Sequence, residues 1–303
     1  MNDEPTQLFD RGLLLRRRLR ARDSLASADF LLRRAAGDIA ERLDATLRDF
    51  PLAVELGTRS PAMADELRQL ERVGTVIAAA PDARLLPDAA APAIACDEEL
   101  VPFAPASLDL VVSALSLHWV NDLPGTLIQI RRALKPDGLF IAAIPGGNTL
   151  TELRQSLLAA DAELTGGAAP RVSPFADIRD LGALLQRAGF ALPVVDLEPA
   201  TVRYDSMFAL LRDLRAMGGT NALVGRERKP MRRDILMRAA EIYAERFADP
   251  DGRIRATVEI IHLSGWAPHE SQQKPLRPGS AVTRLADALG TTEMPAGEKP
   301  SHS

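Results

Sequence analysis

Hydrophobic residues near the start of the chain follow helical spacing. Between residues 25 and 50, apolar side chains recur three or four positions apart, as on one helix face, at Leu31, Leu32, Ala35, Ile39, Leu43 and Leu47. The preceding stretch "RGLLLRRRLRARDS", which begins at Arg11, combines arginines with leucines. This pattern predicts two amphipathic helices, the first of which packs Leu13, Leu14 and Leu19 on the body of the protein.

Strand and helix patterns alternate from residue 51 onward. Short apolar runs such as "PLAVELG", "TVIAAA" and "SLDLVVSAL" are typical of strands covered on both faces. Amphipathic stretches lie between them, including "SPAMADELRQLERVG", for which we expect Ser60 at the N-cap and Pro61 at the first helical position. The alternation predicts an α/β protein whose parallel sheet has helices on both faces.

The alternation becomes less regular after Gly147. Further helices are expected, among them "SMFALLRDLRAMG". We expect the Met and Leu face of this helix to pack in the core. A late strand, "RATVEIIHLSGWAP", is expected to return to the sheet. We therefore divide the chain into an N-terminal helical segment (1–50), an α/β core (51–198), a helical addition with the last strand (199–289) and a disordered tail (290–303), which lacks apolar residues to bury.

Composition and charge exclude several classes of protein. The 37 basic and 41 acidic residues give a net charge of -4, which offers no general reason to bind nucleic acid or an anionic membrane. Cys96 is the single cysteine, so the chain forms no intramolecular disulfide, and a reducing cytoplasm suits it best. No apolar run approaches the ~20 residues of a membrane-spanning helix, and the start lacks the order of a signal peptide.

A metal site is not expected from the sequence. The stretch "HESQQ" from His269 lacks the second histidine of the zinc motif H-E-x-x-H, because Gln273 stands at that position. Three other histidines and no paired cysteines leave few ligands.

The stretch "AVELGTRSP", residues 53–61, carries features of a ligand-binding turn. Ligands of an open parallel sheet bind beyond the carboxyl ends of its strands, where the strand order reverses. Gly57 would let the backbone approach such a ligand and present N–H groups at a helix start. One glycine is weak support for a cofactor site.

A longer block, residues 95–143, strengthens this prediction. It contains, in order, "ACDEELVPF", "SLDLVVSAL", "LHWV" and a helix that ends in "LKPDG". The block resembles the central segment of class I S-adenosylmethionine-dependent methyltransferases. The resemblance implies a Rossmann-like, mostly parallel seven-stranded sheet and S-adenosylmethionine as cofactor. The cofactor-binding residues that it implies are Glu55, Gly57, Asp97, Ser113, Leu115 and Ser116. Asp97 would hold the adenine amino group, and the alternative is that it only caps a turn.

Other stretches narrow the resemblance. "LFDRGLLLRRRLRA", "RVSPFADIRDLGALLQRAGF" and "GWAPHESQQKPLRPGSA" are similar to the respiratory complex I assembly-factor branch, arginine hydroxylases with a methyltransferase fold. This implies action on an arginine of a small iron–sulfur subunit during early assembly. Because the shared motif begins almost at the start of the chain, we interpret the chain as a bacterial relative of this branch. The malonyl-acyl-carrier-protein methyltransferase of biotin synthesis shares the core motifs, but the C-terminal stretch argues against it.

The cofactor turn departs from the pattern of that superfamily. Arg59 and Pro61 stand where glycines are usual, and "TVIAAAPDA" ends its strand without an acid to hold the ribose, the nearest carboxylate being Asp82. Loss of that contact would weaken binding about tenfold or more. Arg59 either blocks the cofactor or meets the cofactor's carboxylate or Glu55.

Two features follow the later strands. His118 is a candidate general base because its imidazole titrates near neutral pH, and the alternative is a hydrogen-bonded histidine beside Trp119. "GGN", residues 146–148, predicts a strand-to-helix turn in which Asn148 caps the next helix.

Two hypotheses of function follow. The first is an S-adenosylmethionine-dependent enzyme that acts on a protein arginine of complex I and associates peripherally with that membrane complex. The second is a non-catalytic assembly protein with a degenerate cofactor site. Methyl transfer needs little acid–base help because positioning supplies most of the catalysis, so the absence of a catalytic dyad favours neither.

Overall fold

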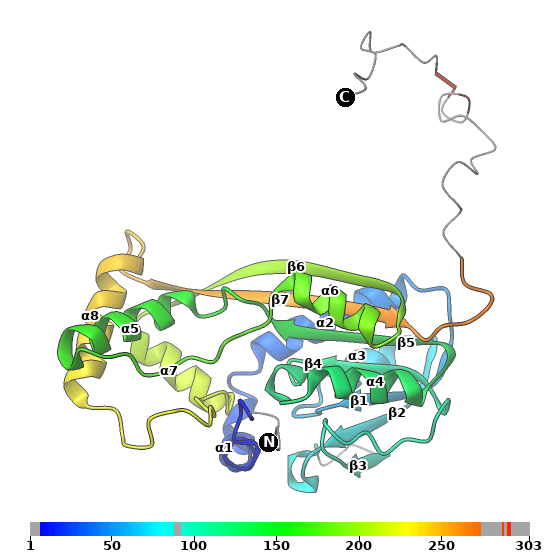
Figure 1. Cartoon of the computed structure of the whole chain (residues 1–303), viewed down its shortest axis with the longest axis horizontal. Helices are drawn as coiled ribbons and strands as arrows, with labels where there is room; N and C mark the ends of the chain where they lie inside the picture. Colours follow the sequence, from blue (N-terminus) through cyan, green and yellow to red (C-terminus); the bar gives the residue numbers. More distant parts are fainter. Residues whose placement is uncertain (1–6, 88–91, 274–286, 288–289, 292–303) are drawn as a thin grey trace, which may run out of the picture. The chain divides into compact units, whose positions relative to one another are not determined.

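The computed structural model describes residues 7–87, 92–273, 287 and 290–291. Contacts divide the chain into two compact units, Met1–Pro268 and His269–Ser303, and the helices and strands named below lie in the first (Figure 1). No helix among the described residues is long and apolar enough to cross a membrane. The predicted tail from residue 290 lies almost entirely outside the described residues, as does most of "QQKPLRPGSA".

The elements follow one another in the order that the sequence predicts. The helices are α1 (Arg11–Leu25), α2 (Phe30–Asp44), α3 (Ala62–Gln69), α4 (Leu123–Ala133), α5 (Thr151–Thr165), α6 (Ile178–Arg187), α7 (Met207–Ala216) and α8 (Arg233–Phe247), with 3-10 turns η1 (Ala83–Leu85) and η2 (Leu117–Trp119). The strands are β1 (Phe50–Leu56), β2 (Val73–Ala80), β3 (Ala93–Ala95), β4 (Leu108–Ala114), β5 (Leu134–Pro145), β6 (Ala191–Tyr204) and β7 (Ile254–Trp266).

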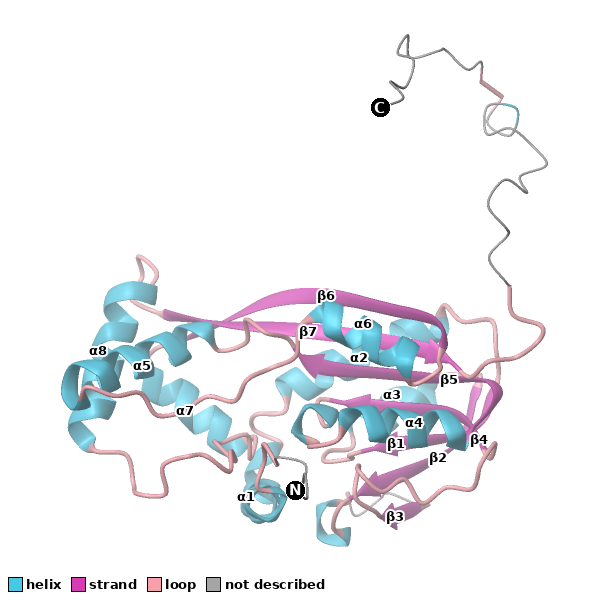
Figure 2. Ribbon diagram, viewed as in Figure 1, coloured by secondary structure: helices cyan, strands magenta, loops and turns pink. Residues whose placement is uncertain are grey.

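The strands form one seven-stranded sheet in the order β3-β2-β1-β4-β5-β7-β6 (Figure 2). The first five are parallel, and β7 lies antiparallel between β5 and β6. This confirms the predicted mostly parallel sheet and the late strand that returns to it. The strand order reverses between β1 and β4, which places the turn after β1 where open sheets bind ligands.

Apolar clusters on both faces explain why the strands read as continuous hydrophobic runs. On one face α4 and α6 pack Leu127, Ile130 and Leu185 against β1, β4 and β5. On the other face α2 and α3 pack Ile39 and Met63 against the same strands (Figure 1). Each central strand is therefore buried on both sides.

Strands β6 and β7 extend beyond the other strands to meet α5, α7 and α8 (Figure 2). There a third apolar cluster includes Met207, Leu210 and Tyr243, and the Tyr243 hydroxyl donates to the carbonyl of Arg255 at 2.8 Å. Helices α7 and α8 lie where the sequence predicts helices, and the Met and Leu face of α7 packs in this cluster as expected. The border that we placed between residues 198 and 199 falls inside β6.

Some local predictions need correction. Helix α3 begins at Ala62 with Pro61 at the N-cap, one residue later than predicted, although the Ser60 hydroxyl accepts from the Ala62 N–H at 3.3 Å. Asn148 does not cap α5, because the helix begins at Thr151 after Leu150. The Asn148 side chain instead donates to Glu259 Oε1 at 2.7 Å, which fixes the loop to β7.

Candidate cofactor site and acceptor cleft

The turn after β1 packs tightly against the end of β4. Gly57 has a φ of +85°, and a Cβ at this position would lie 2.2 Å from Ser116 Oγ, so only glycine fits. The N–H groups of Gly57 and Thr58 both donate to the carbonyl of Ala79 at 2.8 Å. The glycine thus serves packing between β1, β2 and β4.

Glu98 is the centre of a buried cluster at this edge of the sheet. Its Oε1 accepts from Ser116 Oγ at 2.7 Å and from Arg18 Nη1 at 3.2 Å, and its Oε2 accepts from Arg11 Nη2 at 2.5 Å. Burial opposes ionisation of Glu98, but the two guanidiniums prevail and lower its pKa to about 2. Ion pairs from Arg11 and Arg18 to Glu98 therefore hold helix α1 against the carboxyl ends of β3 and β4.

Arg18 keeps unused donors in this cluster. Its side chain is buried, and its Nε and Nη2 have no hydrogen-bond partner among the described residues. Burial and the nearby charge of Arg11 lower the pKa of Arg18, while Glu98 opposes this. These donors could receive an anionic group of a ligand.

Asp97 lies at the edge beside Glu98. Its Oδ1 accepts from Arg11 Nη2 at 2.5 Å and from the N–H of Glu99 at 2.9 Å, and its side chain is 39% exposed. Asp97 therefore caps a turn, as the alternative interpretation has it, and also forms an ion pair. Glu98 and Arg11 were not predicted as site residues from the sequence.

Arg59 crosses from the turn to the end of α7. Its Nη2 donates to the carbonyl of Met217, which is the C-cap residue of that helix, where a cation is favourable. Burial, together with the charge of Arg18, lowers the pKa of Arg59 to about 9. The contact that the structure gives Arg59 is thus with α7 and not with Glu55.

Glu55 and Ser113 lie within the sheet. Ser113 Oγ donates to the carbonyl of Leu56 at 2.8 Å, which ties β4 to β1. Glu55 is 4% exposed, its Oε2 has no hydrogen-bond partner among the described residues, and burial raises its pKa to about 8. Leu115 has a φ of +49° and donates its N–H to the carbonyl of Ala143. Of the predicted site residues, Gly57 lies against Ser116, and Asp97 is linked to Ser116 through Arg11 and Glu98.

The end of β2 offers no free carboxylate for a ribose. Both carboxylate oxygens of Asp82 accept from the Arg84 side chain, at 2.9 and 2.7 Å. Those hydrogen bonds lower the pKa of Asp82 to about 2. This agrees with the departure seen in the sequence.

His118 lies among aromatic rings and arginines. Its ring centroid is 5.0 Å from that of Trp119 and 6.2 Å from that of Phe175, and its buried Nδ1 has no hydrogen-bond partner among the described residues. Burial and the charges of Arg18 and Arg59 lower the pKa of His118 well below its usual value. The imidazole is therefore neutral at pH 7 and a weak proton acceptor.

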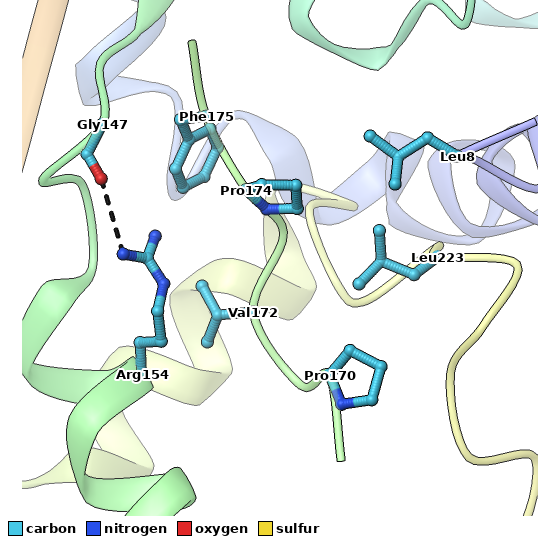
Figure 3. A pocket seen from close by; sticks show the side chains of 8 residues that line it. All are labelled: Leu8, Gly147, Arg154, Pro170, Val172, Pro174, Phe175 and Leu223. Carbon is cyan, nitrogen blue, oxygen red and sulfur yellow. Dashed lines mark hydrogen bonds between the residues drawn. The ribbon is translucent and has the colours of Figure 1, made fainter. Parts of the chain in front are cut away.

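An open cleft of about 470 Å³ is lined in part by Phe175, whose ring neighbours that of His118 (Figure 3). It is lined by Leu8, Gly147, Arg154, Pro170, Val172, Pro174, Phe175 and Leu223. Arg154 is the charged residue of the lining, and the hydrogen bonds of its guanidinium to other described residues are long, to the carbonyls of Gly147 at 3.5 Å, Thr149 at 3.3 Å and Ser173 at 3.5 Å. The cleft suits an apolar group that adjoins an anion.

Three features define the class I methyltransferase fold: the strand order, the antiparallel β7 inserted between β5 and β6, and the glycine turn where the strand order reverses. A family model described as "Methyltransferase domain" matches residues 54–142. The protein "Arginine-hydroxylase NDUFAF5, mitochondrial" of Danio rerio is 40% identical over 286 residues, covering 92% of this chain and 89% of its own. The human protein of that name is 41% identical and covers 89% and 80%. The chain belongs to the arginine-hydroxylase NDUFAF5 family.

More distant similarities agree with this class. "Malonyl-[acyl-carrier protein] O-methyltransferase" of Laribacter hongkongensis is 40% identical over 195 residues, covering 64% of this chain and 63% of its own. Among solved structures, YcgJ of Bacillus subtilis superposes with a TM-score of 0.53 at 14% identity, covering 77% of this chain and 98% of its own. That structural likeness shows the fold.

Proposed function

We propose that the chain is an S-adenosylmethionine-dependent enzyme that acts on an arginine of a respiratory complex I subunit, an iron–sulfur subunit, during assembly. The observation that carries the proposal is the similarity at 40% identity across 92% of the chain to a protein named arginine hydroxylase. A bacterial cytoplasm is the proposed setting, and the single cysteine supports a reducing compartment.

Some residues at the carboxyl ends of the parallel strands support the binding of S-adenosylmethionine, and others do not. The unpartnered Nε and Nη2 of Arg18 fit the carboxylate of S-adenosylmethionine, which would relieve two buried donors. Asp97 would accept from the adenine amino group, after its Oδ1 gives up Arg11. Ser116 covers Gly57 and leaves no room for a close approach there.

The acceptor would enter by the cleft that Phe175 and Arg154 line. A substrate arginine is repelled by Arg154, so the proposal places the apolar neighbours of that arginine in the cleft and the guanidinium outside it, nearer His118.

The test is deletion of the gene in the source cell followed by mass spectrometry of the complex I subunits. We expect impaired assembly and an arginine that loses its added mass. Normal assembly with an unchanged arginine mass would refute the proposal. Calorimetric titration with S-adenosylmethionine tests the cofactor separately, and no heat at millimolar ligand would favour a non-catalytic assembly protein with a degenerate site.

Arg154 favours a second candidate. A guanidinium in an apolar cleft suits an acyl group that ends in a carboxylate, and relatives are named malonyl-acyl-carrier-protein O-methyltransferase. Under this alternative the purified chain would methylate the malonyl group on its carrier protein, and the deletion strain would require biotin.

A further inference from the structure

Three side chains far apart in the sequence converge between α2 and the end of the sheet. Asp38 comes from α2, Glu198 from β6 and His262 from β7. His262 Nε2 lies 3.5 Å from Asp38 Oδ2 and 3.8 Å from Glu198 Oε2. One ligand atom from each residue lies within 4.8 Å of the other two.

Two of these three ligand atoms, His262 Nε2 and Asp38 Oδ2, have no hydrogen-bond partner among the described residues. His262 is 2% exposed, and neither of its ring nitrogens has a hydrogen-bond partner among the described residues. The buried Asp38 Oδ2 has none either. Unpaired buried polar atoms are costly, so two of them aimed at one point indicate a missing partner.

The charges around the three residues leave a deficit of positive charge. On the same surface Arg34 binds Glu198, and Arg42 Nη2 binds Asp196 Oδ2 at 2.8 Å. Three carboxylates thus face two guanidiniums on this surface.

The spacing matches that of metal ligands. Tetrahedral bonds of about 2.1 Å to zinc separate the ligand atoms by about 3.4 Å. The two separations from His262 Nε2 are 3.5 and 3.8 Å, so a cation could be bound with small side-chain movements. Glu198 and Asp38 are partly exposed, which leaves a path from solvent and room for water ligands.

We propose that Asp38, Glu198 and His262 form a site for a divalent transition-metal ion, of which zinc is the best match. One imidazole with two carboxylates is a donor set that zinc accepts, with water completing the coordination. The ion would fasten α2 to β6 and β7. Because the site is made from three distant segments, the sequence carries no spacing motif for it, and our expectation of no metal rested on such motifs.

This inference does not depend on the proposed function. The test uses the tag-free full chain, stripped with a chelator and titrated with Zn²⁺ by calorimetry, with cobalt absorption as a second probe. We expect about one equivalent of Zn²⁺ to bind and to raise the melting temperature. Asp38→Asn and His262→Gln should each weaken binding at least about 100-fold, since each removes a direct ligand.

Two variants serve as controls. Glu71→Gln removes an exposed acid outside the cluster, and His269→Gln removes a histidine outside it, so both should bind as the native chain does. If His262→Gln fails to fold by circular dichroism, the isosteric Asp38→Asn decides. The proposal is overturned if the native chain takes up no Zn²⁺ saturably, if the ligand variants bind normally, or if the controls lose binding equally, which would mean an adventitious ion only.

Discussion

Arg18 Nη1 and Glu98 Oε1 form an ion pair of 3.2 Å in which both side chains are buried. The pair joins an N-terminal helix to the end of β3, at the place where the fold class binds its cofactor. Removing one partner of a buried pair leaves the other charge without compensation.

We expect Glu98→Gln to lower the free energy of unfolding by about 3 kcal/mol, because Arg11 and Arg18 then lack their shared anion. Urea denaturation at neutral pH measures the change. Glu71→Gln, at an exposed acid, is the control and should stay within about 0.5 kcal/mol of the native chain. Equal effects of the two changes would contradict the structural role of the pair.

Glu55 should make stability fall as the pH rises. Its pKa is raised by burial to about 8, whereas the unfolded chain ionises near 4.5. Between these values the folded protein holds a proton that the unfolded chain has released, so the stability present below pH 4.5 is lost toward pH 8. The loss is about 5 kcal/mol at most.

Glu55→Gln removes this dependence. Urea titrations of the variant and the native chain at several pH values should show the variant gaining relative stability with increasing pH. Parallel profiles would show that Glu55 ionises in the folded state as freely as in the unfolded chain.

Gly57→Ala should cost about 3 kcal/mol of stability, from its positive φ and from the clash with Ser116. In a Ser116→Gly background the clash disappears and the backbone cost remains, so the same substitution should then cost about 1 kcal/mol. Thermal or urea denaturation of the four proteins gives the coupling. Additive effects would mean that the turn moves away from Ser116.

The sheet was predictable because its signals are local. Apolar runs separated by turn residues indicate where each strand lies, as "LFIAAIPGG" does for β5. The turn glycine was marked by its place between a strand and a helix, whereas Asp97 and Ser116 were named as site residues from the resemblance of their block to a known superfamily.

The charged residues that surround the turn glycine, Asp97 and Ser116 were not predictable. Arg11 and Arg18 are seven residues apart and so lie on one face of α1, but arginines on an amphipathic helix most often face solvent. The side of α1 that is buried became evident only from its contact with Glu98. The convergence of His262 with two acids has no local signal at all, since it depends on how β6, β7 and α2 pack.

Arg11 should compete with the cofactor. Its Nη2 binds both Asp97 and Glu98 at 2.5 Å, so Arg11→Ala frees Asp97 Oδ1 to accept from an adenine. We expect S-adenosylmethionine to bind about tenfold more tightly to the variant, as measured by calorimetry. The exposed Arg16 on the same helix supplies the control, Arg16→Ala, which should bind as the native chain does. Weaker binding by Arg11→Ala would indicate that α1 orders the site instead of occupying it.

Arg154 distinguishes the two candidate acceptors. Arg154→Met keeps the cleft apolar and removes its charge, whereas Arg154→Lys keeps the charge. If a protein arginine is the acceptor, Arg154→Met should restore its modification in the deletion strain, since no anion has to be bound. If a malonyl carboxylate is the acceptor, methyl transfer by Arg154→Met should fall at least about tenfold in vitro, because a charge-assisted hydrogen bond is lost, and Arg154→Lys should keep most of it. If Arg154→Met loses arginine modification while Arg154→Lys keeps it, the charge of Arg154 takes part in binding the protein substrate. That result would contradict our placement of the apolar neighbours of the substrate arginine in the cleft.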